Sequence, residues 1–538
     1  MSNLSLSHDY VLYYRAGNWI ADASPNSNYS DIIGIDGTTV LNEVLALGTV
    51  SVKIKENAGF VPSATINIQT GNQIYLERYV TIDGSAQSFD IFTANNVSNF
   101  CVLGGIVKSE ASYVAVKIEG TSSDFEVKIR AKGGGGGIYV TGTANDGTVA
   151  CEGQNLGLAV STGSPAATDG VPVFLDELTS KVLVEYSRNI DSSGSGVGTV
   201  NAWSSGVFRG SYHQIEAAFS ENSAGGGALV GSALASSNRT HDIQLGQIMM
   251  NLGNTWAFGI QNCYNIQVGR INSYKAGAFS AAGKGEAGVN FYGNYQNVTV
   301  SEIISSYSQA EGVIVGTADS HTCSNLHIGR IISYDNYQGA SGSGGQSGLY
   351  LLANNSSTLT DVTIDDSQVF DDQGTHTQLY GANIQTVSGA TLTNVRIKYL
   401  TGTGNVTALR TVNLSGTVSG WFDFGLSSLT ADNTLTGQTA DVSSLCSVTS
   451  DLATVYEVGS EVQCTAFTSG TEHVSVSYTD PYNNVVTKDF GTITATGIQN
   501  FSSMNIRAKA GTIVKIVTSG SAVATYDISG WIRAKSTI

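Results

Sequence analysis

The feature that most restricts the fold of this chain is a short segment that recurs through its middle. The stretch NIQVGRINSY at 265–274 returns almost unchanged as NLHIGRIISY at 325–334, and looser versions stand between and around them. A period of 23 to 36 residues separates the first apolar residues of the versions. These residues are Ile243, Ile266, Val298, Leu326, Val362 and Val395. Such a period, with one short strand in every unit, is typical of a solenoid that stacks coils along an axis.

Within each unit the apolar residues alternate with polar ones, and then the alternation breaks. Leu326 and Ile328 are two residues apart, whereas Ile331 follows only after three. Because the side chains of a strand alternate between its faces, this pattern predicts a strand with one inward face and then a bend. The residues expected inside are Ile266, Val268, Val298, Val300, Leu326, Ile328, Val362 and Ile364. A second strand follows in each unit, in GVNFYG, GVIVGT, GLYLLA and GANIQT.

An asparagine or an aspartate stands directly before the first apolar residue of every unit. These residues are Asp242, Asn265, Asn297, Asn325, Asp361 and Asn394. Asn and Asp tolerate the left-handed backbone region and bond to nearby backbone groups, so they predict the same corner in every coil. Amide side chains stacked in such a column can also hydrogen-bond to one another.

The repeat with its asparagine column resembles the right-handed parallel β-helix of the pectate-lyase-like superfamily, over residues 39–425. At its start, the stretch that begins DGTTVLNEVLALG predicts a short amphipathic helix with Thr38 or Thr39 as N-cap, and such a helix can cover the open end of a solenoid. A helix followed by the first strands is similar to the start of β-helix domains in phage tailspikes. The apolar face of the helix would hold Val40, Leu41, Val44 and Leu45.

Four parts are expected along the chain. They are a short N-terminal attachment or capping segment at 1–38, the parallel β-helix at 39–425, a Ser/Thr-rich linker at 426–444 and a C-terminal β-sandwich domain at 445–538. The sandwich is predicted from hairpin-like segments such as VSVSYTDPYNNVVTKDF. The predicted fold class is therefore all-β: a right-handed parallel β-helix (solenoid) with a C-terminal β-sandwich.

The net charge of the chain limits the kinds of partner that it can be expected to bind. Its 43 acidic and 26 basic residues give a net charge of −17. Nucleic acid and anionic membrane surfaces both require a basic patch, so neither is expected as a partner. The chain has no apolar run of about 18 residues, so no membrane insertion is predicted. Its first residues lack a basic n-region, so no secretory signal is predicted either.

Six cysteines are scattered without a CxxC pair, so no metal site and no cofactor is predicted. Cys263 and Cys323 take the same place two coils apart, roughly 9.6 Å by strand spacing, which is beyond the reach of a disulfide. They should stay thiols. Cys446 and Cys464 could be bridged within one small domain, or could be buried thiols like the others.

Chemistry is expected where the repeat stops matching itself, nine residues after the first apolar residue of each unit. The residues there are Lys275, Tyr307, Asp335, Asp371 and Gly404 in successive units. With coils roughly 4.8 Å apart, Asp335 and Asp371 should project side by side. Asp372 and His376 follow closely along the chain.

Three interpretations of this cluster are open. Close carboxylates suit a retaining glycosidase and more widely spaced ones an inverting enzyme, and like charges raise one pKa to produce an acid. Lys275 with Tyr307 would instead be the proton-abstracting machinery of a lyase. All of these residues could also be solvated turn residues, since Asp is common in turns. The first interpretation makes Asp335, Asp371 and Asp372 the candidate catalytic residues.

Aromatic residues stand one position earlier in three of the units, at Tyr274, Tyr334 and Phe370. Stacked rings could form a platform for flat sugar faces, or they could be a packing ladder on the flank of the solenoid. Glu286, Glu311 and His321 border the same coils and could complete a groove, although a lone loop histidine is more often incidental. The candidate substrate-binding residues are Tyr274, Lys275, Tyr307, Glu311, Tyr334 and His376.

A weaker resemblance is to polygalacturonase-like glycosidases. It rests on the order Asp371-Asp372, His376 and then Arg396-Ile397-Lys398. In that family the histidine lies a coil away from the acid pair, whereas here it is four residues away, and the family's preceding Asn-Thr-Asp is missing.

The tailspike resemblance implies a virion tailspike or fibre that acts outside the cell. Such a protein binds and depolymerises a host surface polysaccharide, here by glycoside hydrolysis rather than by elimination. The resemblance also implies a homotrimer attached to a baseplate or tail protein of the virion. The alternative function is a non-enzymatic β-helical adhesin or structural spike that only binds.

Overall fold

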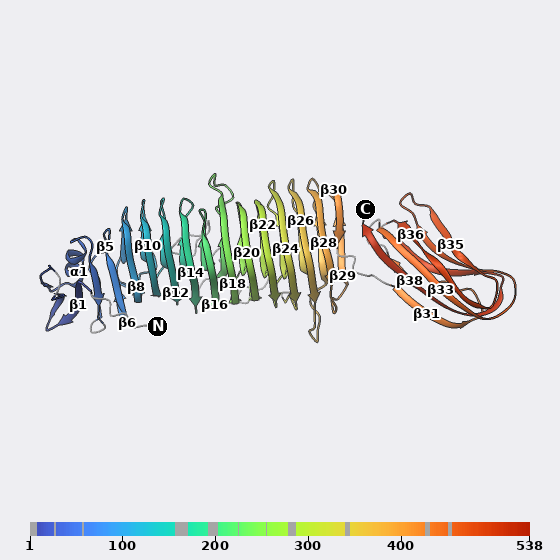
Figure 1. Cartoon of the computed structure of the whole chain (residues 1–538), viewed down its shortest axis with the longest axis horizontal. Coiled ribbons are helices and arrows are strands. Elements are labelled where there is room, and N and C mark those ends of the chain that lie inside the picture. Colours follow the sequence, from blue (N-terminus) through green and yellow to red (C-terminus); the bar gives the residue numbers. More distant parts are fainter. Residues whose placement is uncertain are drawn as a thin grey trace.

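The computed structural model describes residues 8–25, 28–55, 59–156, 170–191, 203–223, 225–253, 255–277, 287–338, 345–424, 431–449, 454–509 and 511–537. Most of the chain is a row of coils whose strands lie side by side along one long axis (Figure 1). Two long sheets run the length of this row, one of 17 strands and one of 13. Each coil contributes one strand to each sheet, and from β4 onward neighbouring strands are parallel.

The 17-stranded sheet, called here the larger sheet, contains every coil's longer strand. Its members are β1 (Tyr10–Arg15), β2 (Asn18–Ala23), β3 (Ile32–Gly34), β4 (Ser51–Ile54), β6 (Gln73–Asp83), β8 (Ser98–Lys108), β10 (Ser123–Lys132), β12 (Asn145–Gln154), β14 (Ser180–Ile190), β16 (Gln214–Ser223), β18 (Thr240–Gly253), β20 (Cys263–Ala276), β22 (Tyr295–Ser306), β24 (Thr322–Tyr334), β26 (Thr358–Phe370), β28 (Thr391–Thr401) and β30 (Thr417–Phe424).

The 13-stranded sheet, called here the smaller sheet, faces the larger one across the interior. Its members are β5 (Ile66–Ile68), β7 (Phe92–Asn95), β9 (Val114–Glu119), β11 (Gly136–Val140), β13 (Val171–Leu175), β15 (Trp203–Phe208), β17 (Gly226–Val230), β19 (Phe258–Ile260), β21 (Val289–Gly293), β23 (Val313–Thr317), β25 (Ser347–Ala353), β27 (Tyr380–Thr386) and β29 (Ala408–Leu414).

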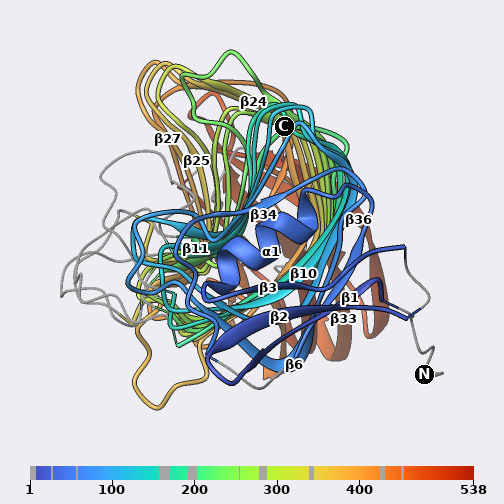
Figure 2. The same ribbon diagram turned by 90° about the vertical axis from the view of Figure 1, so that its left-hand side faces the viewer.

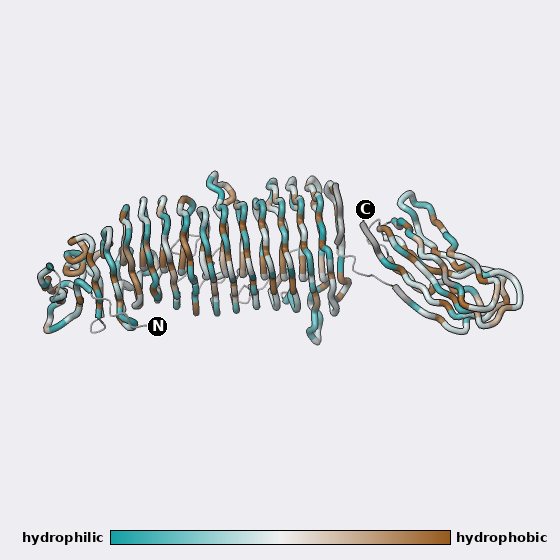
Figure 3. Tube along the Cα trace, viewed as in Figure 1, coloured by the Kyte–Doolittle hydropathy of each residue, from teal (hydrophilic) through white to brown (hydrophobic). Residues whose placement is uncertain are grey.

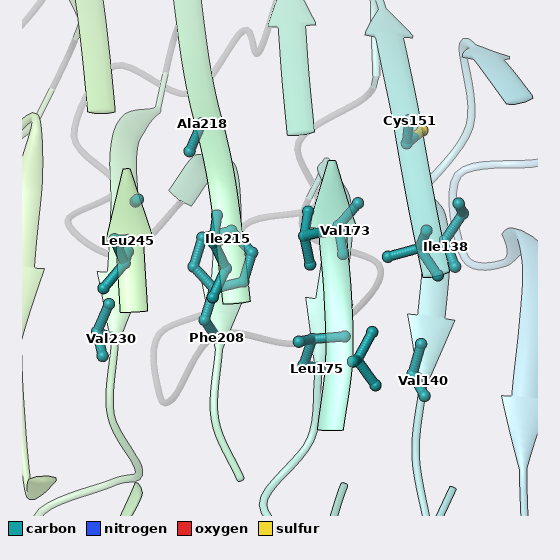
Figure 4. Packing of buried hydrophobic residues seen from close by; sticks show 14 of the residues in the cluster. Ile138, Val140, Cys151, Val173, Leu175, Phe208, Ile215, Ala218, Val230 and Leu245 are labelled. Atoms are coloured by element: carbon teal, nitrogen blue, oxygen red, sulfur yellow. The ribbon is translucent and has the colours of Figure 1, made fainter. Parts of the chain in front are cut away.

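The interior between the two sheets is filled by aliphatic and aromatic side chains, coil upon coil. Figure 4 shows part of this packing, where Ile138, Val173 and Phe208 of the smaller sheet meet Ile215 and other residues of the larger one. Along the tube in Figure 3, hydrophobic and hydrophilic residues alternate on many of the strands. The prediction of the interior is confirmed, because all eight residues expected inside are at most 2% exposed.

The column of Asn and Asp residues forms the predicted corner. All six residues of the column adopt a left-handed backbone, with φ between 51° and 56°. The amide nitrogen of Asn325 donates to the side-chain oxygen of Asn297 at 2.9 Å, Asn297 donates to Asn265 at 3.0 Å and Asn265 to Asp242 at 3.1 Å. Asn394 donates to Asp361 at 2.8 Å. The side chains of the column therefore hydrogen-bond to one another, as predicted, in two runs from Asp242 to Asn325 and from Asp361 to Asn394.

Helix α1 (Gly37–Leu45) lies across the N-terminal end of the coils, where the view along the axis places it over the interior (Figure 2). Its residues Val40, Leu41, Val44 and Leu45 are buried, as predicted. The predicted N-cap is wrong. Asp36 is the cap, because its carboxylate accepts hydrogen bonds from the backbone amides of Thr38 at 3.3 Å and Thr39 at 3.1 Å. A carboxylate one residue before the helix reaches these amides better than a threonine inside the first turn.

Before the helix, β1 to β3 form an antiparallel meander, and β1 also pairs in parallel with β4. Residues 10–34 of the segment predicted for attachment or capping are thus joined to the larger sheet. All six cysteines are buried free thiols, including Cys263 and Cys323. Cys446 and Cys464 are not bridged.

The last part of the chain forms two antiparallel four-stranded sheets beyond the final coil (Figure 1). One sheet contains β31 (Ala431–Gln438), β33 (Thr454–Ser469), β36 (Gly497–Ala508) and β38 (Val523–Thr537); the other contains β32 (Ser447–Thr449), β34 (Glu472–Thr479), β35 (Val485–Ile493) and β37 (Ile513–Gly520). They share a cluster of buried residues separate from that of the coils. Strand β31 falls within the segment 426–444 predicted as a linker. It pairs with β38, so this part of the segment belongs to the C-terminal sheets.

Candidate functional site

The cluster predicted from the repeat lies where the strands of the larger sheet end. Lys275 is the second-to-last residue of β20, whereas Tyr307 and Asp335 directly follow β22 and β24; their φ values are 55°, 55° and 53°. The repeat therefore contains a second corner with left-handed backbone, at the opposite end of each strand from the Asn and Asp column. Tyr307 and Asp335 begin the connections from the larger sheet toward the smaller one, and Lys275 lies at the end of its strand.

Asp371 lies inside a tight turn and has no exposed surface. Its Oδ2 accepts hydrogen bonds from the backbone amides of Thr377 at 2.7 Å and Gln378 at 2.9 Å. Its Oδ1 accepts from the backbone amide of Gln373 at 3.2 Å and from the Gln373 side chain at 3.1 Å. The ring Nδ1 of His376, an exposed residue, is 3.6 Å from Oδ1. The carboxylate therefore holds residues 371–378 in a closed turn.

The electrostatics of Asp371 agree with this geometry. Burial by itself raises the pKa of a carboxyl group, but the amides of Gln378, Thr377 and Gln373 outweigh burial, and the pKa of Asp371 is lowered. A raised pKa, as paired acids would produce, is not found at Asp371. This carboxylate is suited to staying ionised and to holding the turn.

Asp335 is 5% exposed and lies against the same turn. Its Oδ1 accepts a hydrogen bond from the backbone amide of Asp372 at 2.8 Å, so the structure brings Asp335 and Asp372 together. A hydrogen bond to Asp335 and the negative charge of its carboxylate raise the pKa of Tyr307. The side chain of Asp372 is exposed, and no partner for it lies within the described residues.

The aromatic residues form a continuous row beside these acids. The ring centroids of Tyr274 and Tyr307 are 5.6 Å apart, those of Tyr307 and Tyr334 6.1 Å, and those of Tyr334 and Phe370 5.3 Å with nearly parallel planes. The Nζ of Lys275 lies 5.1 Å from the centre of the Tyr274 ring. The rings pack on one another while remaining partly exposed, so this row has the contacts of a packing ladder and keeps surface for a ligand.

The remaining predicted residues do not join this cluster. Glu311 is fully buried, and its Oε1 accepts hydrogen bonds from the backbone amides of Gly345 at 2.9 Å and Gln346 at 3.1 Å, just before β25. His321 is exposed, with its Nδ1 2.6 Å from the carbonyl oxygen of Asp319. Glu286 lies outside the described residues.

The order shared with polygalacturonase-like enzymes does not become a compact site. Lys398 forms an ion pair with Asp365 at 2.5 Å, and His327 contacts the other oxygen of Asp365 at 2.8 Å. These residues lie along the face of the larger sheet. Asp371 and Asp372 lie at the ends of the strands, in the turn described above.

A groove that sequence reasoning missed runs along the outer face of the larger sheet, beside the Asn and Asp column. It has a volume of about 830 Å³ and spans β16 to β24. Asn265, Asn297 and Asn325 line one side, and Gln214, Gln244 and Gln267 line the other. We call it the amide groove. A second hollow continues from it over Gly246 and Gly269.

The three glutamines of the amide groove stand at one position of successive strands. Gln214 is beside Gln244 in the register of β16 with β18, and Gln244 is beside Gln267 in that of β18 with β20. Within the described part of the chain, none of their side-chain amides has a hydrogen-bond partner. In the sequence, the row could be recognised only as a polar residue that recurs directly after the first apolar residue of the repeat. Such a position is expected to be ordinary outward-facing surface, so it did not indicate a groove.

Aromatic rings border the amide groove at its N-terminal end. His241 stacks on Tyr264 with centroids 4.8 Å apart, and Tyr212 meets the edge of His241 at 5.4 Å. Beneath them His213 is buried, and burial lowers its pKa to about 4. Its ring is therefore neutral at physiological pH. Among the described residues, no group of three or more His, Cys, Asp or Glu side chains could hold a metal ion, and no helix is both long and apolar enough to cross a membrane.

Comparison with known proteins gives structural matches and no sequence matches. No family model matches the chain, and no curated protein does. A variant of the tailspike protein of Escherichia coli bacteriophage HK620, solved in complex with a hexasaccharide, is similar with a TM-score of 0.50 at 11% identity, over 93% of this chain and 90% of that chain.

Two further solved structures match with lower scores. One is the same tailspike with a pentasaccharide, with a TM-score of 0.37 at 13% identity over 93% of this chain and 90% of that one. The other is the A-module of a mannuronan C-5 epimerase from Azotobacter vinelandii, with a TM-score of 0.39 at 11% identity over 71% of this chain and 93% of that one. The sheets and the tailspike match together give the chain the right-handed parallel β-helix fold of tailspike-like proteins.

Proposed function

We propose that this protein binds a polysaccharide along the outer face of its larger sheet, in the amide groove. The observation that carries the proposal is the row of Gln214, Gln244 and Gln267 side chains without partners. Each primary amide offers two donors and one acceptor oxygen, which is the complement of a sugar hydroxyl. Successive coils repeat these groups roughly every 4.8 Å, so a linear polymer lying across the coils meets the same chemistry at each step.

The lining of the amide groove favours uncharged sugar units. Asp242 is its only acidic lining residue within the described range, and its carboxylate is engaged by Asn265 and by His241 at 2.7 Å. The exposed ring of Tyr212 adds an apolar face at one end, where a pyranose can stack. The tailspike protein with the same fold was solved with a bound hexasaccharide, which supports a glycan as ligand.

The wider biological role is part of the proposal. A tailspike-like solenoid that binds polysaccharide suits a virion spike or fibre that attaches to a host surface, working as a homotrimer joined to a tail or baseplate protein. A non-enzymatic adhesin would use the same groove for attachment alone.

Cleavage of a polysaccharide at the second corner, at the opposite end of the strands from the amide groove, is a second candidate function. It is favoured by the juxtaposition of Asp335, Asp372 and the row of aromatic rings from Tyr274 to Phe370. In this version Asp372 and Asp335 act as the acid and base of glycoside hydrolysis, and Asp371 positions them by holding the turn. The release of reducing ends, compared with the formation of unsaturated ends, would separate hydrolysis from elimination.

The test of binding uses immobilised bacterial surface polysaccharides as probes, with neutral and acidic members. The doubly substituted variant Gln244→Ala/Gln267→Ala should bind at least about tenfold more weakly, since it removes two hydrogen-bonding groups from the groove. Gln154→Ala is the matched control, because Gln154 is also an exposed glutamine at a strand end but lies outside the groove. Equal binding by the double variant and the wild type would remove the amide groove from the proposal.

A further inference from the structure

A second groove lies on the larger sheet, over its N-terminal coils. It has a volume of about 700 Å³ and is lined by residues of β6, β8, β10, β12 and β14. Three cationic side chains line it, namely Arg78, Lys128 and Arg130, and Glu152 is its only acidic lining residue among the described residues. We call it the arginine groove. It is unusual in a chain whose net charge is −17.

A bulge in β6 forms one wall of the arginine groove. The register of β6 against β8 passes from Leu76 beside Gly104 directly to Thr81 beside Ile106. The four residues 77–80 of β6 therefore lie opposite one residue of β8, Gly105. This bulge projects Arg78 and Tyr79 outward, with the Arg78 guanidinium 5.4 Å from the centre of the Tyr79 ring. Bulges of this kind re-aim side chains and recur beside functional sites.

Glycines allow the bulge to sit close to the neighbouring strand. Gly104 and Gly105 both have left-handed backbones, with φ of 86° and 64°. A Cβ on Gly104 would lie 2.4 Å from the carbonyl oxygen of Leu76, and one on Gly105 would lie 2.6 Å from the Leu76 Cβ. Positions 104 and 105 therefore cannot carry a side chain without a shift of Leu76, and both glycines line the groove.

The charges around the arginine groove are paired, with two exceptions. Lys128 is bound by Glu126 at 2.8 Å and Glu185 at 2.6 Å, and Glu152 lies 4.0 Å from Arg188. The guanidinium groups of Arg78 and Arg130 have no carboxylate partner within the described residues.

The two unpaired groups differ in how they are held. Arg130 donates one hydrogen bond, to the carbonyl oxygen of Arg78 at 2.5 Å, and so ties down the bulge. The Arg78 guanidinium lies over the Tyr79 ring and has no hydrogen bond or ion pair among the described residues. Most of the ten N–H donors of the two guanidinium groups are therefore available in the groove.

From these observations we propose that the arginine groove binds an oxyanion carried by a polysaccharide, either a carboxylate or a sulfate or phosphate ester. A guanidinium matches the planar, two-oxygen edge of such groups and keeps its charge at all physiological pH values. The inference rests on the proposed function, since it takes the ligand to be the polysaccharide bound in the amide groove. The two grooves are close together, because Tyr186 of β14 lines the arginine groove and Gln214 of the next strand, β16, lines the amide groove. One glycan on this face can reach both.

The test measures the binding of three soluble probes by calorimetry: oligogalacturonate, sulfated dextran oligosaccharide and unmodified dextran oligosaccharide. The wild type should bind an acidic probe more tightly than the neutral one. Added salt should weaken the binding of the acidic probes and leave the binding of the neutral probe unchanged. Arg78→Gln should weaken acidic binding about tenfold, the worth of one charge-assisted hydrogen bond, and leave neutral binding unchanged. Preference for galacturonate identifies a carboxylate site, and preference for sulfated dextran an ester site.

The matched control is Arg533→Gln in the C-terminal sheets, since Arg533 is also an exposed arginine stacked on an aromatic ring, that of Trp531 at 5.7 Å. It should bind all three probes as the wild type does. Equal affinity of the wild type for acidic and neutral probes would overturn the proposal that the arginine groove binds an oxyanion. Equal losses of affinity for the acidic probes in Arg78→Gln and Arg533→Gln would overturn it as well. That result is distinct from a failure of the proposed function, in which no surface polysaccharide is bound and Gln244→Ala/Gln267→Ala changes nothing.

Discussion

Replacing Asp371 with asparagine separates a structural role of this carboxylate from a catalytic one. The Asp371 carboxylate accepts four hydrogen bonds, two at each oxygen, and three of the donors are backbone amides. Asparagine keeps one acceptor oxygen and puts an NH2 group where the other oxygen was. Whichever way the amide is turned, two donors lose their acceptor and face another donor.

The expected cost follows from this count. Hydrogen bonds to a charged group contribute about 1.5–3 kcal/mol each, and a buried donor left unsatisfied costs about 1–3 kcal/mol. Two lost bonds at a site with no exposed surface should therefore destabilise the region around the turn by roughly 3–6 kcal/mol. The neighbouring substitution Asp372→Asn should change stability by less than about 0.5 kcal/mol, because this exposed side chain has no partner among the described residues.

Hydrogen exchange is the suitable assay, since a solenoid can open locally without unfolding as a whole. Amide protection of Gln373, Thr377 and Gln378 should collapse in Asp371→Asn and persist in Asp372→Asn. The wild type should lose the same protection on acidification. The pKa of Asp371 is lowered in the fold, so its stabilisation is complete above the unfolded-state value of about 3.8 and is lost as pH falls through the lower folded-state value.

Protection and stability unchanged in Asp371→Asn would refute this reasoning. If polysaccharide cleavage were lost in that variant while the turn stayed protected, Asp371 would regain the catalytic role that the repeat predicted for it.

Other expected outcomes test the interior, the corner, the buried histidine and the last domain. Leu326→Ala should lower the free energy of unfolding by about 2–5 kcal/mol in a urea titration, because Leu326 is 1% exposed within the coils. Asn297→Ala should lower the free energy of unfolding more than Asn297→Gly, since both break the amide ladder but only alanine is strained at a φ of 55°; the reverse order would contradict a left-handed corner at this residue. Acidification should destabilise the coils around His213 as pH falls from about 6.5 to about 4, because the folded state holds the ring neutral while the unfolded state takes up a proton; His213→Gln should flatten this dependence in pH-dependent melting. Removal of residues 431–538 should leave the β-rich circular dichroism of the solenoid in place, and a fully unfolded product would contradict independent folding.

Features of the fold that repeat could be predicted from the sequence. Leu326 and Ile328 alternate as an interior strand must, and Asn325 stands where a left-handed corner recurs, so each coil repeats the same information. The cap at Asp36 was missed because it depends on which of three nearby polar residues, Asp36, Thr38 or Thr39, reaches the first amides of the helix, and spacing alone does not decide that.

The candidate site was harder to predict because its contacts do not follow the repeat. Asp371 is held by residues 373–378, whose turn is specific to one coil, so the repeat could place Asp371 but could not reveal its partners. The arginine groove depends on the bulge at 77–80, where the periodicity of β6 is interrupted. The glutamines of the amide groove were visible in the sequence, but an outward-facing polar residue carries no signal until its neighbours across the coils are known.

The amide ladder at the corner of the coils has a direction, because every described donation in it runs toward the N-terminus and each run of donations stops at an aspartate. Aspartate accepts hydrogen bonds but, when ionised, has none to pass on. Asp242 and Asp361 thus act as terminators that divide the column into two separately polarised chains. Asp361→Asn would supply the missing donor toward Asn325 and fuse them into one, in which each amide further polarises the next. The choice between two nearly identical side chains, Asn and Asp, sets how far along the solenoid that polarisation extends.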